Sequence, residues 1–130
     1  MNIVSPVFVE LPRKTKKDKR VLLNLNVYRN MHFILNNQAK IAYKEAMKSQ
    51  LEGLVLKTPV RLKFTLIRGD RRAGDRANVL SIVEKFFCDA LKEYGCIPDD
   101  NDNYISGQTY ETGEIDKKNP HVKIEIIENV

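Results

Sequence analysis

The chain has 130 residues, which is the size of one domain. Hydrophobic residues make up 42% and charged residues 30%, a composition that excludes collagen-like, disordered and coiled-coil chains. Lysine and arginine number 22 against 17 acidic residues, so the net charge is +5, which is compatible with a polyanionic partner but does not require one.

The N-terminal part of the chain is predicted to form two antiparallel strands joined by a basic loop. Residues 3–11 and 21–28 are rich in aliphatic and β-branched side chains, and in the second segment apolar residues alternate with polar ones. Between them, residues 13–20 read RKTKKDKR and contain six basic side chains and one acidic side chain. A loop of this composition is expected to be exposed to solvent and mobile.

A helix and a strand are expected to follow. Asn30 is a suitable N-cap for a helix that continues to about Gln50 and ends near Gly53. Residues that recur on one face of this helix are predicted to be buried, namely Ile34, Leu35, Gln38, Ile41, Ala42 and Ala46. Residues 59–67 then alternate between apolar and polar side chains, which is the period of a half-buried strand.

A second helix and a final strand complete the predicted fold. Apolar residues recur with a helical period over about 79–94, between an expected N-cap at Asn78 and a stop signal at Gly95. After a polar loop, residues 121–127 alternate as a last strand. The sequence therefore predicts a single compact α+β domain over residues 1–130, with two main helices packed on a mixed or antiparallel sheet.

Several kinds of site and segment are not indicated. Cys88 and Cys96 lack a CxxC pattern and a histidine at ligand spacing, so no zinc site is expected and Cys88 is interpreted as a core thiol. The segment between Gly69 and Gly74 is not a P-loop, so no nucleotide cofactor is expected. The chain has no charged leader and no apolar run of the ~20 residues that span a membrane, so we expect a cytoplasmic protein.

Charged residues gather in segments of opposite sign. Residues 68–76, the arginine segment, carry four arginines and two aspartates, whereas residues 99–116 carry six acidic side chains and no basic one. A basic surface beside a concentrated acidic patch is what a metal-dependent enzyme acting on phosphates requires. Ordinary solvated surface charge explains the same pattern equally well.

Adjacent carboxylates make Asp99 and Asp100 candidates for a metal site. They follow the second helix, whose C-terminal dipole does not stabilise negative charge, and a hard cation would relieve their repulsion. Asp75 precedes the same helix within the arginine segment. Two or three such side chains can share Mg²⁺ or Mn²⁺, although an Asp-Asp pair in a loop also commonly marks a turn.

Lys85 lies one helical turn after Ser81 and one turn before Asp89, so these three residues are expected to share an exposed stripe. A lysine at this position could neutralise the charge that develops on a phosphate in a transition state. The alternative is a surface ion pair with Asp89, which would only stabilise the helix.

Four motifs follow one another along the chain. They are Asn26-Val27-Tyr28, the basic stretch Arg71–Asn78, Lys85 placed four residues before Asp89-Ala90-Leu91, and Gly95 followed by Asp99-Asp100. In this order they resemble the RusA family of Holliday junction resolvases, small endonucleases carried by phages and prophages. The resemblance covers nearly the whole chain and is most specific over residues 71–100.

The resemblance implies a homodimer that cuts branched DNA with Mg²⁺ as its cofactor, or with Mn²⁺ in its place. Asp75, Lys85 and Asp100 are then expected to be catalytic. The resemblance implies Asp75 and Asp100 as metal ligands and Asp99 as a further ligand or a partner of one, and Asp89 is expected as a ligand in place of an acid that the family has and this chain lacks. The basic segments are expected to hold the DNA backbones through Arg13, Lys14, Lys16, Lys17, Lys19, Arg20, Arg68, Arg71, Arg72 and Arg76.

Two departures from the family pattern concern the metal site. Ala77 stands where the family has its second aspartate, and the helix is longer by about four residues, or one turn. Glu84 or Asp89 could replace the missing acid, and Asp89 is favoured because it shares the exposed stripe of the lysine. The helix is about 24 Å long, so Asp75 and Asp100 can share a metal only if the preceding loop folds back or a dimer completes the site.

The leading hypothesis is a dimeric, Mg²⁺-dependent, structure-selective endodeoxyribonuclease that resolves Holliday junctions in recombination and repair. The alternative is a non-catalytic nucleic-acid-binding protein whose nuclease site decayed when Ala77 replaced an acid. Cleavage of a labelled four-way junction with and without Mg²⁺ separates the two hypotheses.

Overall fold

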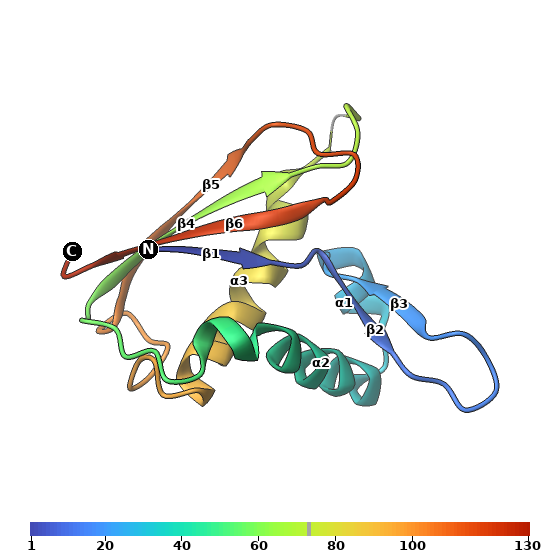
Figure 1. The fold of residues 1–130 in the computed structure, drawn as a ribbon, viewed down its shortest axis with the longest axis horizontal. Coiled ribbons are helices and arrows are strands. Elements are labelled where there is room, and N and C mark those ends of the chain that lie inside the picture. The colour runs from blue at the N-terminus through green and yellow to red at the C-terminus, as the bar shows by residue number, and fades with distance from the viewer. Residues whose placement is uncertain (73) are drawn as a thin grey trace.

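Strands from both ends of the chain form one sheet, and the helices cover a single face of it (Figure 1). The computed structural model describes residues 1–72 and 74–130. Its elements are β1 (Asn2–Ser5), β2 (Phe8–Leu11), β3 (Lys19–Leu22), α1 (Leu25–Asn30), α2 (Phe33–Leu51), β4 (Val60–Ile67), α3 (Arg76–Glu93), β5 (Ile105–Thr112) and β6 (His121–Glu128). The main sheet has the order β1-β6-β4-β5, in which β4 and β5 are parallel and the other pairs antiparallel. The predicted single compact α+β domain with a mixed sheet and two main helices is confirmed, with α1 as a third, short helix.

The core lies between the centre of the sheet and α3. In β4, Leu62 and Phe64 are buried and pair in register with Ile126 and Ile124 of β6. The Phe64 ring meets the Phe87 ring of α3 edge-on, with centroids 6.2 Å apart. The buried stripe of α3 consists of Leu80, Ile82, Val83, Phe86, Phe87, Ala90 and Leu91. Because this stripe is held against the sheet, the remaining face of α3 is available to line a surface site.

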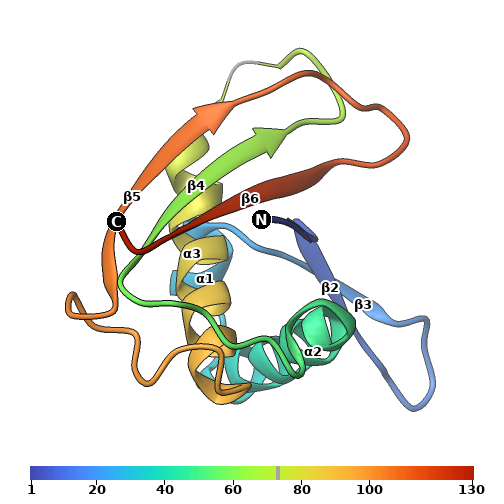
Figure 2. The same cartoon turned by 60° about the vertical axis from the view of Figure 1, so that its left-hand side comes forward.

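The predicted N-terminal hairpin is divided between two sheets. β1 pairs with β6 in the main sheet, whereas β2 and β3 form a separate two-stranded hairpin whose exposed loop projects away from the body (Figures 1 and 2). The strand predicted over 21–28 is correct only as far as Leu22. Asn24 then starts α1, because its side-chain oxygen accepts a hydrogen bond from the Val27 backbone N–H at 2.8 Å.

Both long helices begin at caps other than the predicted ones. His32, and not Asn30, is the N-cap of α2, since Asn30 is already the last residue of α1. Asp75, and not Asn78, is the N-cap of α3. The predicted stop at Gly95 is confirmed, because this residue has a φ of +74°, a conformation that favours glycine.

The buried face of α2 differs from the predicted one. Its buried side chains recur every four residues and are Ala39, Tyr43, Met47 and Leu51. Of the predicted face, Leu35 and Ala42 do pack partly buried against the core, but Ile34 and Ile41 are 51% and 66% exposed, so the prediction is wrong for them. Tyr43 decides the orientation, because its ring packs against Phe86 of α3 with centroids 5.7 Å apart.

β5 is a strand that the sequence pattern does not predict. Its sequence, ISGQTYET, is polar and has no alternation of buried and exposed apolar residues. It forms the edge of the sheet and gains its hydrogen bonds from β4, with pairs that run from Val60↔Ile105 to Leu66↔Thr112. Its position brings the loop before it, which contains Asp100 and Asp102, beside α3.

Candidate functional site

A polar pocket of about 410 Å³ lies between α3, the loop that follows it and β5. We call it the carboxylate pocket. It is lined by Ser81, Glu84, Lys85, Cys88, Asp100, Asp102, Ile105 and Gln108. The pocket brings together two of the three predicted catalytic residues, Lys85 and Asp100, and adds the two acids Glu84 and Asp102.

Glu84 is held in this pocket by a tyrosine from β5. The Tyr110 hydroxyl donates a hydrogen bond to Glu84 Oε1 at 2.7 Å. Burial and the bond to the Glu84 carboxylate raise the pKa of Tyr110, so the hydroxyl remains a donor at neutral pH. The Tyr110 ring packs edge-on against Phe64, with centroids 6.0 Å apart, which fixes the position of the hydroxyl. Within residues 1–72 and 74–130 no ion pair engages Glu84, so its second oxygen is available to a cation.

Cys88 packs against the core, as predicted, but it is only half-buried and also lines the pocket beside these acids. Burial, together with the negative charges of Glu84, Asp100 and Asp89, raises the pKa of its thiol to about 12. The side chain is therefore a neutral thiol at physiological pH and not a nucleophile. The charges that disfavour the thiolate here would favour a bound cation.

The carboxylate pocket supplies oxygen donors without forming a complete metal cage. Among the described residues, no three His, Cys, Asp or Glu side chains are gathered closely enough to hold a metal ion. Mg²⁺ does not need such a cage, because it is commonly bound by one or two carboxylates and keeps several waters. The Ser81 Oγ is buried in the pocket wall and has no hydrogen-bond partner among these residues, so it does not face the pocket as a ligand. The carboxylates of Glu84 and Asp100 therefore fit a hydrated Mg²⁺.

Lys85 is exposed and lies next to an aromatic ring of α1. Its Nζ is 5.7 Å from the centroid of the Tyr28 ring, which is within the range of a cation–π contact. The Tyr28 ring in turn meets Phe86 edge-on, with centroids 6.2 Å apart. Tyr28 belongs to the first sequence motif and Lys85 to the third, so the fold brings these two motifs into contact.

Asp89, the acid that the sequence favours as a substitute at Ala77, lies outside the carboxylate pocket. Its Oδ2 is 3.1 Å from Lys44 Nζ of α2, so it is engaged across the α2–α3 interface. The alternative interpretation of Lys85 as the ion-pair partner of Asp89 is not what the structure shows. Of the two candidate substitutes, Glu84 is the one that lines the pocket.

Asp99 and Asp75 also lie outside this pocket. Asp99 Oδ1 accepts a hydrogen bond from the Asp100 backbone N–H at 2.8 Å and pairs with Lys92 Nζ at 3.2 Å. These contacts lower the pKa of Asp99. Asp75 caps the opposite end of α3. The structure therefore places Asp100 with Lys85, and does not bring Asp75 or Asp99 to them.

The predicted DNA-binding residues of the hairpin loop are all exposed. Arg13 Nε donates a hydrogen bond to the Lys17 carbonyl at 2.7 Å, and Arg20 lies over the Phe8 ring, 3.9 Å from its centroid. Arg20 also pairs with Glu10 at 3.6 Å. No ion pair within the described residues engages Lys14, Lys16, Lys17 or Lys19. These four lysines are available to phosphates.

The arginine segment lies between β4 and α3. Arg68 Nη2 donates a hydrogen bond to the Gly74 carbonyl at 2.8 Å, and Arg72 Nε pairs with Asp70 at 3.3 Å. Arg71 and Arg76 are also exposed.

The loop around Asp100 and the hairpin loop lie at opposite sides of the molecule in both views (Figures 1 and 2). A nucleic acid that touches both must therefore extend across the domain.

Sequence reasoning missed Asp102, Gln108 and Tyr110 as residues of this site. Asp102 belongs to the acidic run and could have been found by treating the run as one group with Asp100. Gln108 and Tyr110 lie on β5, whose polar sequence gives no strand signal, so nothing in the pattern placed them beside α3.

Neither a protein-family model nor a curated protein matches this chain. Among the helices of the described residues, none combines the length and the apolar character that a membrane crossing demands. The function proposed for the chain therefore depends on the carboxylate pocket and on the order of the sequence motifs.

Substitutions of Asp75 can separate two ways in which it could stabilise α3, namely as the N-cap and through its negative charge. Its carboxylate accepts a hydrogen bond from the Ala77 backbone N–H at 3.0 Å. We expect Asp75→Ala to lower the free energy of unfolding by about 1 kcal/mol and the Tm by about 4 °C. Asp75→Asn should leave both unchanged, because asparagine caps helices as well as aspartate does. Thermal melts of both variants test this, and equal losses would show that the charge, and not the cap, stabilises α3.

Proposed function

We propose that this protein is a Mg²⁺-dependent, structure-selective endodeoxyribonuclease that resolves Holliday junctions and similar branched DNA. The observation that carries the proposal is the carboxylate pocket, in which Lys85 lies beside Glu84, Asp100 and Asp102. The four motifs that resemble the RusA family support the same activity. Two exposed basic segments supply the charge that a DNA backbone requires.

The residues of the pocket divide into a metal-holding group and a phosphate-contacting group. Glu84 and Asp100 would hold Mg²⁺, which when bound polarises the phosphate and lowers the pKa of water. Tyr110 keeps Glu84 oriented through its hydrogen bond at 2.7 Å. The Lys85 ammonium, held near the Tyr28 ring, would neutralise charge that develops on the phosphate.

The basic segments contact the sugar–phosphate backbone and not the base edges, so selectivity would follow the shape of the branch. A homodimer would place two such pockets symmetrically on a four-way junction and allow paired cuts. We place this activity in the cytoplasm of a bacterial or phage-infected cell.

Two observations favour the non-catalytic alternative. Asp75, a metal ligand by the motif resemblance, is the N-cap of α3 and does not line the carboxylate pocket. No group of three metal-binding side chains is gathered within the described residues. A protein that binds branched DNA through its basic segments without cutting it is consistent with both facts.

Cleavage of a labelled four-way junction decides between the two functions. The proposal expects paired nicks with Mg²⁺ and none with EDTA, and unbranched duplex DNA of the same sequence should remain intact. Junction binding without cleavage in Mg²⁺ and in Mn²⁺ would establish the alternative.

The hairpin loop gives a second prediction. Replacing Lys16, Lys17 and Lys19 with alanine removes three exposed cations that no ion pair within the described residues engages. We expect weaker binding to junctions of every sequence. The salt dependence of log K should also be shallower, by about 0.9 for each phosphate that the loop no longer neutralises.

The matched control replaces three exposed lysines outside the basic segments, Lys57, Lys117 and Lys118, with alanine. It has the same net charge as the loop variant, so a general effect of charge would flatten both salt dependences equally. Equal slopes for the two triple variants would contradict a specific role of the hairpin loop.

A further inference from the structure

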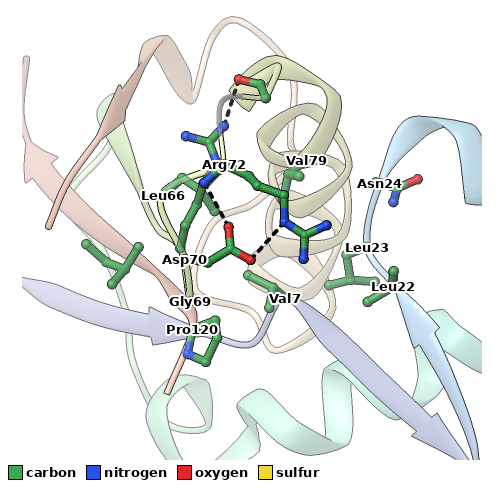
Figure 3. Close-up of a pocket in the computed structure, with 13 residues that line it drawn as sticks. Val7, Leu22, Leu23, Asn24, Leu66, Gly69, Asp70, Arg72, Val79 and Pro120 are labelled. Carbon is green, nitrogen blue, oxygen red and sulfur yellow. Dashed lines mark hydrogen bonds and ion pairs between the residues drawn. The ribbon is translucent and has the colours of Figure 1, made fainter. Parts of the chain in front are cut away.

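A second pocket, of about 520 Å³, lies between the end of β4, the start of α3 and the open end of the β2–β3 hairpin, which is the end opposite its loop (Figure 3). We call it the apolar pocket. Its walls are formed mainly by Val7, Leu22, Leu23, Leu66, Val79 and Pro120. Among the described residues that line it, none is aromatic. Its volume lies in the range of small-molecule sites, which is about 300–1,000 Å³.

The wall residue Leu22 exposes an apolar surface that the fold leaves uncovered. Leu23 and Leu66 are buried, but Leu22 is 50% exposed although it belongs to β3. In the same strand, Lys19 and Arg20 of the basic hairpin shortly precede this leucine. The exposed apolar surface at Leu22 therefore lies next to the basic surface of the hairpin, which attracts polyanions.

The lining of the apolar pocket includes an ion pair between Asp70 and Arg72. Asp70 accepts hydrogen bonds from the Arg72 backbone N–H at 2.9 Å and from Arg72 Nε at 3.3 Å (Figure 3). These bonds lower the pKa of Asp70, so it stays charged and holds the guanidinium in place. The Arg72 side chain is 90% exposed, which leaves its terminal nitrogens available to a phosphate. Arg68, which also lines the pocket, is the second cation.

We infer that the apolar pocket receives an unpaired base of the bound DNA while Arg72 contacts the phosphate next to it. This inference rests on the proposed function for the presence of branched DNA. Apolar walls match the faces of a base, and the cations of the lining match its phosphate. The pocket is lined both by the arginine segment and by the end of β3, the strand that leads away from the hairpin loop, so a strand held by both segments would pass beside it. A branch point supplies the occupant, because base pairing is interrupted there.

The test uses a junction with 2-aminopurine at the branch point and a dye at the end of one arm, in EDTA so that no cleavage occurs. Dye anisotropy reports binding, and 2-aminopurine emission reports whether the base leaves the stack. We expect emission to rise on binding, because the aliphatic pocket removes base stacking without offering an aromatic ring. Leu22→Trp should abolish the rise, because the indole gives the base the aromatic stacking partner that the aliphatic walls lack. Arg72→Gln should reduce the salt dependence of log K by about 0.7 for a single-stranded phosphate.

Val55→Trp is the matched control, because Val55 is 79% exposed and does not line the pocket. It should bind and raise emission like the parent. A parent protein that binds the junction without any rise overturns the inference, and cleavage of the same junction in Mg²⁺ then shows whether the proposed function still stands. If Leu22→Trp keeps the rise in emission but alters the oligomeric state measured by sedimentation, the pocket is an interface with a second copy of the chain. This result also overturns the inference. Failure to bind any branched DNA overturns both proposals.

Discussion

Asp100→Asn is expected to reduce junction cleavage by at least about a hundredfold while junction binding stays equal or becomes tighter. Asp100 lines the same pocket as Lys85 and Glu84, and its charge contributes to the raised pKa of Cys88. Asparagine keeps the size of the side chain but removes the negative charge that a metal requires. The substitution also removes a repulsion between the pocket and a phosphate. Single-turnover cleavage in Mg²⁺ and a gel shift in EDTA measure the two effects separately.

The control for this variant is Glu45→Gln, which neutralises an exposed carboxylate on α2 outside the pocket. It should cut at the parental rate. Asp75→Asn, which retains the helix cap, tests whether Asp75 is needed for cleavage, as the motif resemblance implies, or is not needed, as its position outside the pocket indicates. If Asp75→Asn also abolishes cleavage, the site extends to the start of α3, for example through a second subunit. An Asp100→Asn protein that cuts like the parent contradicts the assignment of the pocket.

The regular elements with a strong apolar pattern could be predicted from the sequence. β4, β6 and α3 each carry one continuous apolar face, so their period alone defines which residues are buried. α2 has apolar residues on two sides, so the helical period of its sequence does not show whether the side of Ile41 or the side of Tyr43 is buried. The choice depends on Phe86 of α3, a contact between residues 43 positions apart.

The candidate site was predictable only where a motif or a charge run marks it. The spacing of Lys85 and Asp100 within the motifs indicates both residues from the sequence alone. Tyr110 was not predictable, because β5 forms a strand through its pairing with β4 and not through its own composition. The partner of Asp89 could not be read from α3 alone, since Lys44 comes from another helix.

Glu84→Gln is expected to raise the Mg²⁺ concentration needed for cleavage more than any other substitution. Glu84 lines the pocket, and Tyr110 holds one of its oxygens, so we infer that it replaces the acid missing at Ala77. We expect Glu84→Gln to raise the Mg²⁺ concentration for half-maximal cleavage by at least about tenfold, and Tyr110→Phe to raise it by about tenfold through loss of orientation. Mg²⁺ titrations of cleavage measure both shifts, and Mn²⁺ binding followed by electron paramagnetic resonance measures them without turnover.

Asp89→Asn is the matched comparison, because it changes the same helix by the same kind of neutralisation. It removes a partly exposed ion pair with Lys44, which should cost no more than about 1 kcal/mol of stability, and its Mg²⁺ titration should match the parent. A raised requirement in Asp89→Asn with a parental titration in Glu84→Gln would reverse the assignment and make Asp89 the substitute acid. Parental titrations in both variants would leave Asp100, Asp102 and water as the ligands. Thermal melts of all three variants in EDTA separate these outcomes from loss of folding, because a bound metal stabilises the folded state and its loss would lower the Tm by itself.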